Sequence, residues 1–364
     1  MGFSNRFLRA LTSVPKRLVC LVAALVCVFP PQVSAEVRGS LLVVNKSSDT
    51  VSVIALPDRQ VVAELPTGPG PHEIAVSPDG SRAIVSNYDH PDTETGSLTL
   101  IDITGGRVAA TISLAPYQHP HGVAWLADNR QVLVTAEASD ALLLVDTGEP
   151  ETGVVGAIGT GQTLSHMVAV DAVRNRAYVT NIVSGSLSVL DLGTRKLTTV
   201  VPTGAGTEGL AVRPGSGEVW VTNREENTLA VVDPASLTVT RRIPTGDFPL
   251  RVRFTEDGRL CLVTNGLASS VSVVDADSGA SFDVPLAGQW NWATGRNAGG
   301  WFGWQTLPVG VLTIPGTARA YVANSHGGVI SVVDLQTREI VETLVAGAEP
   351  DGLAFSPYRF GATQ

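Results

Sequence analysis

The chain has 364 residues, of which 44% are hydrophobic and 16% are charged, and its formal net charge is −9. This composition excludes an intrinsically disordered chain, which combines low hydrophobicity with high net charge. The acidic balance also argues against a nucleic-acid-binding protein, because such proteins present a basic surface to the phosphates.

The first 35 residues have the layout of a secretory signal peptide. Four basic residues precede an apolar run, residues 18–29, and a small-residue triplet ends at Ala35. We predict that residues 1–35 are a signal peptide cleaved after Ala35, and that the mature protein is periplasmic or secreted. An N-terminal anchor that stays uncleaved is the alternative.

Cleavage would remove four basic and no acidic residues, which lowers the net charge from −9 to −13. No later stretch has 18 consecutive apolar residues, so no membrane span is expected after the leader is removed. We expect no nucleic-acid partner. Cys261 would be the one remaining cysteine, and its apolar neighbours predict a buried small residue.

A strand-like segment recurs seven times in residues 36–364. The copies are Leu41–Asn45, Ala83–Asn87, Val132–Ala136, Ala177–Asn181, Val219–Asn223, Cys261–Asn265 and Ala320–Asn324. They start 42 to 49 residues apart, except for a step of 59 before the last copy. Each period is rich in Val, Leu, Ile and Thr and is bounded by Gly, Pro, Asn and Asp, which are strand and turn signals. Four short strands in a period of this length are typical of a propeller blade.

The two ends of the array predict how the ring closes. The first copy has no strand before it, whereas the last is followed by an extra strand-like segment, residues 350–357. Joining residues 41–66 to residues 350–357 completes a seventh blade and removes the open sheet edges. We therefore predict an all-β fold: one seven-bladed β-propeller of four-stranded antiparallel blades in residues 36–364.

The repeated segments resemble the YVTN family of β-propeller repeats. The residues that carry the resemblance are Tyr178–Asn181, Trp220–Asn223 and Tyr321–Asn324, and the likeness extends over residues 41–357. It implies an extracytoplasmic propeller. Similar propellers include surface-layer proteins, lactonase-like enzymes and the haem d1 domain of a nitrite reductase, so the resemblance does not select a function.

The topology of four-stranded blades predicts that all six histidines lie on one face of the ring. The position that opens the innermost strand is occupied, in blade order, by Asp351, His72, His121, His166, Glu208, Leu250 and Val309. Three imidazoles with carboxylates suit Zn, Cu, Fe or Mn, so the first five of these residues are a candidate metal site. Non-covalent haem with an axial histidine is a variant of this interpretation. The alternative is that these side chains only pack between blades.

Two loops interrupt the repeat on the same face. The loop of blade 2 carries His90 among acidic residues, and a solvated loop is the alternative to a cation cap. The Trp-rich insertion, residues 289–306, contains Trp290, Trp292, Arg296, Trp301, Phe302 and Trp304. It is interpreted as a lid over the channel, as a patch that docks a protein partner, or as residues that pack on one another.

Arg251 lies on an innermost strand, where small or apolar residues usually pack. It is either an anion clamp in the channel or a member of a buried ion pair with Glu208 or another acid. His119 and His326 complete the set of candidate ligand-binding residues on this face.

Two functions therefore remain open. The first is an exported binding or scaffold module that meets a small ligand or a protein partner at the channel face. The second is a metal- or haem-binding propeller, which includes a hydrolase or lyase. The sequence contains no nucleophile elbow, phosphate loop, dinucleotide fingerprint or covalent haem motif, so it leaves enzymatic activity undecided.

Overall fold

The computed structural model describes residues 37–88, 96–286, 290–291, 296–297 and 306–362. The chain divides into two units, Met1–Ala35 and Glu36–Gln364. The predicted signal peptide lies outside the described residues and stays a prediction. Among the described residues, no helix has the length and apolar character needed to cross a membrane.

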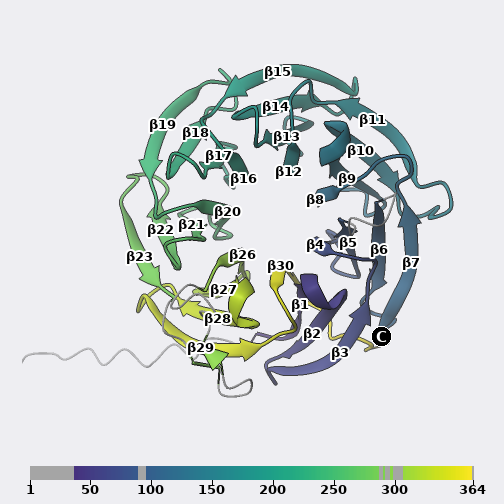
Figure 1. Ribbon diagram of the computed structural model, residues 1–364, viewed down its shortest axis with the longest axis vertical. Helices are drawn as coiled ribbons and strands as arrows, with labels where there is room; N and C mark the ends of the chain where they lie inside the picture. Colours follow the sequence, from purple (N-terminus) through teal and green to yellow (C-terminus); the bar gives the residue numbers. More distant parts are fainter. Residues whose placement is uncertain (1–36, 89–95, 287–289, 292–295, 298–305, 363–364) are drawn as a thin grey trace, which may run out of the picture. The chain divides into compact units, whose positions relative to one another are not determined.

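Residues 37–362 form seven four-stranded antiparallel sheets arranged as the blades of a ring (Figure 1). From the innermost strand outward, blade 1 is β30 (Pro350–Ser356), β1 (Gly39–Asn45), β2 (Thr50–Leu56) and β3 (Gln60–Pro66). Blade 2 is β4 (Pro71–Val76), β5 (Arg82–Asn87), β6 (Ser97–Asp102) and β7 (Arg107–Ser113). Blade 3 is β8 (Pro120–Trp125), β9 (Gln131–Ala136), β10 (Ala141–Asp146) and β11 (Val154–Gly159). Blade 4 is β12 (Ser165–Asp171), β13 (Arg176–Asn181), β14 (Ser186–Asp191) and β15 (Lys196–Pro202).

The remaining blades follow the same order. Blade 5 is β16 (Thr207–Val212), β17 (Val219–Asn223), β18 (Thr228–Val232) and β19 (Val239–Pro244). Blade 6 is β20 (Pro249–Phe254), β21 (Leu260–Asn265), β22 (Ser270–Asp275) and β23 (Ser281–Pro285). Blade 7 is β26 (Pro308–Thr313), β27 (Arg319–Asn324), β28 (Val329–Asp334) and β29 (Glu339–Val345). Short 3-10 turns are η1 (Lys46–Ser48), η2 (Glu137–Ser139) and η3 (Ser325–Gly327), and β24 (Trp290–Asn291) pairs with β25 (Arg296–Asn297).

The ring closes as the sequence predicts. β1 pairs with β2 on one side and with the C-terminal β30 on the other, so that Leu41 lies opposite both Ile54 and Phe355. In Figure 1 the yellow β30 lies beside the purple β1 at the inner end of blade 1. The predicted seven-bladed, all-β propeller is therefore confirmed.

The hydrophobic core lies between the blades. Seven clusters of buried side chains each join two adjacent blades, and together they occupy every interface around the ring. The middle strands of each blade are buried on both faces, which explains their continuous apolar sequence. Cys261 belongs to the cluster between blades 5 and 6 and is fully buried, as predicted.

The side chain of the asparagine that ends the repeat motif holds neighbouring segments together through hydrogen bonds. Asn45 donates from Nδ2 to Thr50 Oγ1 at 3.0 Å and to Ser52 Oγ at 2.8 Å, which ties β1 to β2. Its Oδ1 accepts the backbone N–H of Gly347 at 2.9 Å, on the other side of the ring closure. The side chain is fully buried, so these bonds replace its contacts with water.

Asn45→Ala should therefore lower the free energy of unfolding by about 2–3 kcal/mol, because it leaves buried hydroxyl and amide groups without their partner. Urea unfolding followed by circular dichroism measures this change. Gln336→Ala, at an exposed turn residue, is the control and should leave the unfolding midpoint unchanged. Equal unfolding midpoints for the unmodified protein, Asn45→Ala and Gln336→Ala would show that the hydrogen bonds of Asn45 do not stabilise the fold.

Each innermost strand bulges where it opens. In all seven blades the pairing of this strand with its neighbour shifts register between the first and the fourth residue. A bulge turns a side chain away from the regular alternation of the strand. At Gly209 and Gly310, the third residues of their strands, a Cβ atom would lie 2.1 and 2.0 Å from a carbonyl oxygen of the next blade. A residue with a Cβ atom therefore has no room at these two positions.

Candidate functional site

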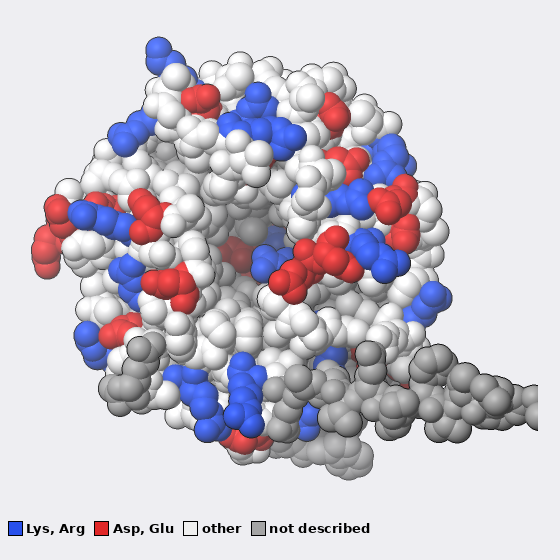
Figure 2. Space-filling view, turned by 180° about the vertical axis from the view of Figure 1, so that it is seen from behind, with Lys and Arg blue, Asp and Glu red and all other residues white. Residues whose placement is uncertain are grey.

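The second residues of five adjacent innermost strands converge at one mouth of the central channel. These residues are Asp351, His72, His121, His166 and Glu208, and each is buried. The centroids of the His72 and His121 rings lie 5.0 Å apart, and those of His121 and His166 lie 3.8 Å apart. Figure 2, which views the ring from behind the view of Figure 1, shows that the ring is hollowed at its centre and that acidic and basic side chains are visible inside the hollow.

Two of the histidines are held neutral. Burial is the main cause that lowers the pKa of His72 to about 4, and nearby Lys46 adds to it. Burial, together with the charge of His166, also lowers the pKa of His121 well below its usual value. His72 Nδ1 lies 2.7 Å from the carbonyl oxygen of Gly70, so it donates there and its Nε2 carries no proton. An unprotonated imidazole nitrogen can bind a metal ion or accept a hydrogen bond.

His166 lies between two carboxylates and is held charged. Its Nδ1 donates to Glu137 Oε1 and its Nε2 donates to Glu208 Oε1 at 2.8 Å. Burial opposes this charge, but the attraction of Glu208 and the bonds to both carboxylates outweigh it and raise the pKa of His166 to about 9. Burial likewise disfavours the carboxylate of Glu208, yet the charges of His166 and Arg251 lower its pKa to about 2.

Arg251 joins the two sides of the channel mouth. Its Nε donates to Glu73 Oε1 at 2.7 Å, and its Nη1 donates to Glu208 Oε1 at 3.1 Å. The second oxygen of Glu208 accepts from Arg224 Nη1 at 2.7 Å. The predicted ion pair of Arg251 with Glu208 is therefore present, and its guanidinium group is engaged by acids of this chain.

These residues line a pocket of about 270 Å³ at the channel mouth. Its lining consists of Lys46, His72, His121, Glu208, Leu250, Arg251, Leu307, Val309, Ser325, His326, Glu349 and Asp351. Asp351 is 6% exposed, and among the described residues its Oδ1 has no hydrogen-bond partner. Burial raises the pKa of this carboxyl group against the opposing charge of Arg251. The pocket thus presents both signs of charge and one unsatisfied acid.

The five predicted metal ligands lie on one rim, but they do not form one coordination group. Within the described part of the chain, one set of three His, Cys, Asp or Glu residues has ligand atoms that all lie within 4.8 Å of one another. This set is His121, Glu137 and His166. The role of His72, Glu208 and Asp351 as metal ligands stays a prediction.

Sequence reasoning missed Glu137, Tyr88 and Lys46. Each directly follows a second strand, β9, β5 or β1, and so occupies one position of the repeat. The OH of Tyr88 donates to Glu137 Oε2 at 2.6 Å, and its ring stacks on His119 with centroids 4.7 Å apart. The signal for all three is this shared repeat position, one residue after the second strand of the blade.

Several predicted ligand-binding residues lie outside the described part of the chain. They are His90, Trp292, Trp301, Phe302 and Trp304. Trp290 and Arg296 belong to the short pair β24 and β25. The three interpretations of the Trp-rich insertion therefore stay predictions.

Non-covalent haem does not fit the described pocket. A volume of 270 Å³ falls below the roughly 300–1,000 Å³ of pockets that hold drug-sized ligands, and a tetrapyrrole is larger than most of these. The lining is charged where a macrocycle requires apolar walls.

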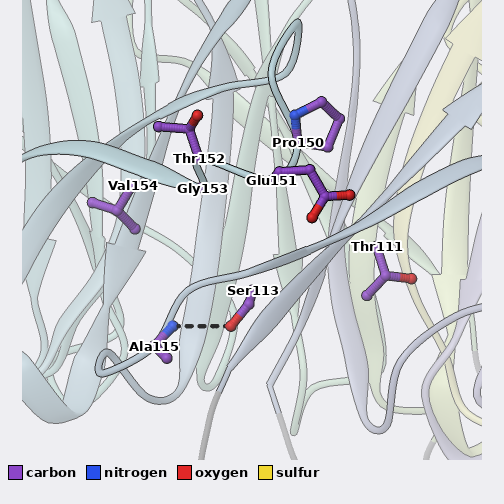
Figure 3. Close-up of a pocket in the computed structure, with 8 residues that line it drawn as sticks. All are labelled: Thr111, Ser113, Ala115, Pro150, Glu151, Thr152, Gly153 and Val154. Carbon is purple, nitrogen blue, oxygen red and sulfur yellow. Dashed lines mark hydrogen bonds between the residues drawn. The ribbon is translucent and has the colours of Figure 1, made fainter.

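A second hollow lies on the outside of the ring between blades 2 and 3 (Figure 3). It has a volume of about 310 Å³ and is lined by Thr111, Ser113, Ala115 and residues 150–154. Glu151 is its one titratable lining residue, and Ser113 Oγ accepts a bond from the backbone N–H of Ala115 at 3.3 Å. Because Glu151 is the one charged side chain that lines this hollow, we consider it a weaker candidate for a binding or catalytic site than the channel mouth.

The seven blades around a polar channel mouth define this protein as a β-propeller. A family model for a YNCE-like β-propeller matches residues 197–284, which supports the predicted propeller family. Comparison with curated proteins gives no match.

Two solved structures share the fold. One is a functionally unknown protein from Desulfotomaculum acetoxidans, with a TM-score of 0.70 and 12% identity over 87% of this chain and 99% of that chain. The other is hydrazine synthase from Kuenenia stuttgartiensis, with a TM-score of 0.66 and 17% identity over 79% of this chain and 90% of that chain. At these identities the likeness concerns the fold alone.

Proposed function

We propose that the protein is a binding module that takes a small polar molecule into the mouth of its central channel. The observation that carries this proposal is the buried Oδ1 of Asp351, which has no partner among the described residues and belongs to a side chain that lines a charged pocket. Buried polar atoms in proteins are almost always hydrogen-bonded, so a group from outside the chain is the natural partner here.

The lining favours a ligand that carries an amino or hydroxyl group at one end and an acidic group at the other. Arg251 is engaged by Glu73 and Glu208, so it stabilises the wall and leaves ligand contact to other side chains. Asp351 can accept from, or when protonated donate to, an amino or hydroxyl group, and the Lys46 ammonium in the same pocket can meet an acidic group. A small amino acid has both groups, and a pocket of 270 Å³ admits a molecule of that size.

Isothermal titration calorimetry with the twenty common amino acids tests this proposal. Glucose lacks the acidic group and citrate lacks the amine, so both serve as comparison probes. At least one amino acid should bind more tightly than either, and Asp351→Asn should weaken it by about 10-fold or more, since bonds to charged groups contribute about 1.5–3 kcal/mol.

Asp58→Asn is the matched control, because Asp58 is 53% exposed at its side chain and pairs with Arg359 away from the pocket lining. It should bind like the unmodified protein. The proposal fails if no amino acid binds, or if Asp351→Asn binds as well as the control. A protein partner docked through the Trp-rich insertion stays a separate prediction, as do export and cleavage after Ala35.

A further inference from the structure

Three side chains from adjacent parts of blades 3 and 4 meet beneath the channel mouth. His121 comes from β8, Glu137 from η2 at the end of β9, and His166 from β12. All three are at least 94% buried, and one ligand atom of each lies within 4.8 Å of the others. Nδ1 of His121 has no hydrogen-bond partner among the described residues, although the ring is almost completely buried.

We propose that His121, Glu137 and His166 form a binding site for a divalent transition-metal ion, with Zn²⁺ as the best match and Fe²⁺ as the next. Two imidazole nitrogens and one carboxylate oxygen are the protein ligands of His₂Glu zinc sites and of non-haem iron sites. Such sites keep at least one coordination position for water or a further ligand. His121 also lines the 270 Å³ pocket, so this position is reached from the channel mouth.

The bonds around the three residues already orient them as ligands. Nε2 of His166 donates to Glu208 at 2.8 Å, which directs Nδ1 of the same ring toward Glu137. The OH of Tyr88 donates to Glu137 Oε2 at 2.6 Å, which leaves Oε1 for the site. Metal-bound histidines and carboxylates are oriented by such second bonds in most known sites.

A proton now joins His166 Nδ1 to Glu137 Oε1. The ion takes the place of this proton, which leaves to solvent, while the proton on Nε2 remains bonded to Glu208. Binding therefore consumes a divalent cation and releases one proton, with no change of oxidation state. Zn²⁺ holds ligand atoms about 2.0–2.2 Å away. The three ligand atoms already lie within 4.8 Å of one another, so side-chain adjustments can bring them around one ion.

This inference goes beyond the proposed small-ligand function and does not depend on it. Asp351 carries the small-ligand proposal and is not one of the three ion ligands, whereas Glu137 is not part of the pocket lining. Asp351→Asn should therefore retain the ion, and loss of amino-acid binding would leave the ion site untouched.

The test uses the full-length protein without an affinity tag, stripped with a chelator and titrated with ZnCl₂ by calorimetry. Bound metal is counted by mass spectrometry after gel filtration. We expect one Zn²⁺ per chain. His121→Phe should weaken binding by at least about 100-fold, because loss of a ligand exceeds the 10–100-fold loss seen when a supporting residue is changed.

Two further variants, His326→Phe and Tyr88→Phe, test whether a loss of Zn²⁺ binding in His121→Phe is specific to the three proposed ligands. The phenyl ring in His121→Phe can still pack against His166, and Nδ1 of His121 has no hydrogen-bond partner among the described residues that the change would remove. His326→Phe changes a histidine of the same pocket lining outside the three ligands and should bind Zn²⁺ like the unmodified protein. Tyr88→Phe removes the donor to Glu137 and should weaken binding by about 10-fold or more.

The proposal is overturned if the stripped protein takes up less than a tenth of an equivalent of both Zn²⁺ and Fe²⁺, or if His121→Phe binds as well as His326→Phe. Circular dichroism shows whether both variants are folded. If His121→Phe does not fold, X-ray absorption spectroscopy of the zinc-loaded unmodified protein decides instead. Two imidazoles and one carboxylate around zinc would support the site, and any other protein ligand set would refute it.

Discussion

Replacing Arg251 by methionine should lower the free energy of unfolding by about 3–5 kcal/mol. The Arg251 side chain is 9% exposed, and its guanidinium group bonds Glu73 at 2.6 Å and Glu208 at 3.1 Å. Methionine fills much of the same volume but leaves two buried acids without their shared cation. Removal of one member of a buried ion pair has a cost of this size because the remaining charge cannot reach water.

The measurement is chemical unfolding at pH 7 in a buffer with a chelator, so that metal binding does not contribute. Arg107→Met is the matched control, since Arg107 pairs with Asp102 at 3.4 Å while 64% exposed at its side chain. Exposed ion pairs contribute little, so this variant should unfold almost like the unmodified protein. Similar unfolding curves for the two variants would show that Arg251 does not hold the channel mouth together.

The position of Arg251 also shows where sequence reasoning stops. The repeat spacing was sufficient to predict seven blades, their strand order and the closure through β30, because each blade is a local hydrophobic pattern. The contact between Arg251 and Glu73 joins residues 178 positions apart, from blades 6 and 2. No local pattern predicts which pairs face each other across the channel.

The bulge at the opening of the innermost strand is a second feature that the repeat alignment did not predict. The repeat alignment identified His72, His121 and His166 as rim residues, but regular strand alternation would turn such side chains toward neighbouring blades. The register shift in every blade redirects them. The predicted convergence at the mouth therefore occurs, although the repeat alignment did not predict the bulge that produces it.

Glu137 was missed for a different reason. In blade 3 the motif ends in Ala136 instead of asparagine, and the next residue was not compared around the ring. The role of Glu137 follows from its burial, because a carboxylate buried at the end of β9 requires charged or hydrogen-bonding partners. His166 and Tyr88 supply them, from β12 and from the residue after β5.

The pH dependence of stability should report the charge on His166. In the metal-free protein the free energy of unfolding should fall by roughly 3 kcal/mol as the pH rises from 6.5 to above 9. The pKa of His166 is raised from 6.5 to about 9, and each unit of difference corresponds to about 1.4 kcal/mol.

The free energy of unfolding falls as the pH rises because the folded protein binds the proton on His166 more tightly than the unfolded chain does. Below pH 6.5 both the folded and the unfolded chain carry the proton on this residue, and its stabilising contribution is fully present. Between pH 6.5 and 9 the folded protein retains a proton that the unfolded chain has released, so each rise in pH favours unfolding. The groups that face His166 are Glu137 and Glu208, which hold the proton, and Arg251 and His121, which lie on its other sides.

His166→Gln isolates this contribution from other groups that titrate in the alkaline range. Glutamine keeps hydrogen-bonding capacity toward the two carboxylates but has no proton to lose between pH 6.5 and 9. The variant should be less stable than the unmodified protein at pH 6.5, and the difference should shrink toward pH 9.5. Urea unfolding at half-unit steps of pH, in the presence of a chelator, gives both curves. A constant difference between them would mean that the folded protein retains no additional proton at the His166 site between pH 6.5 and 9, and would contradict the prediction.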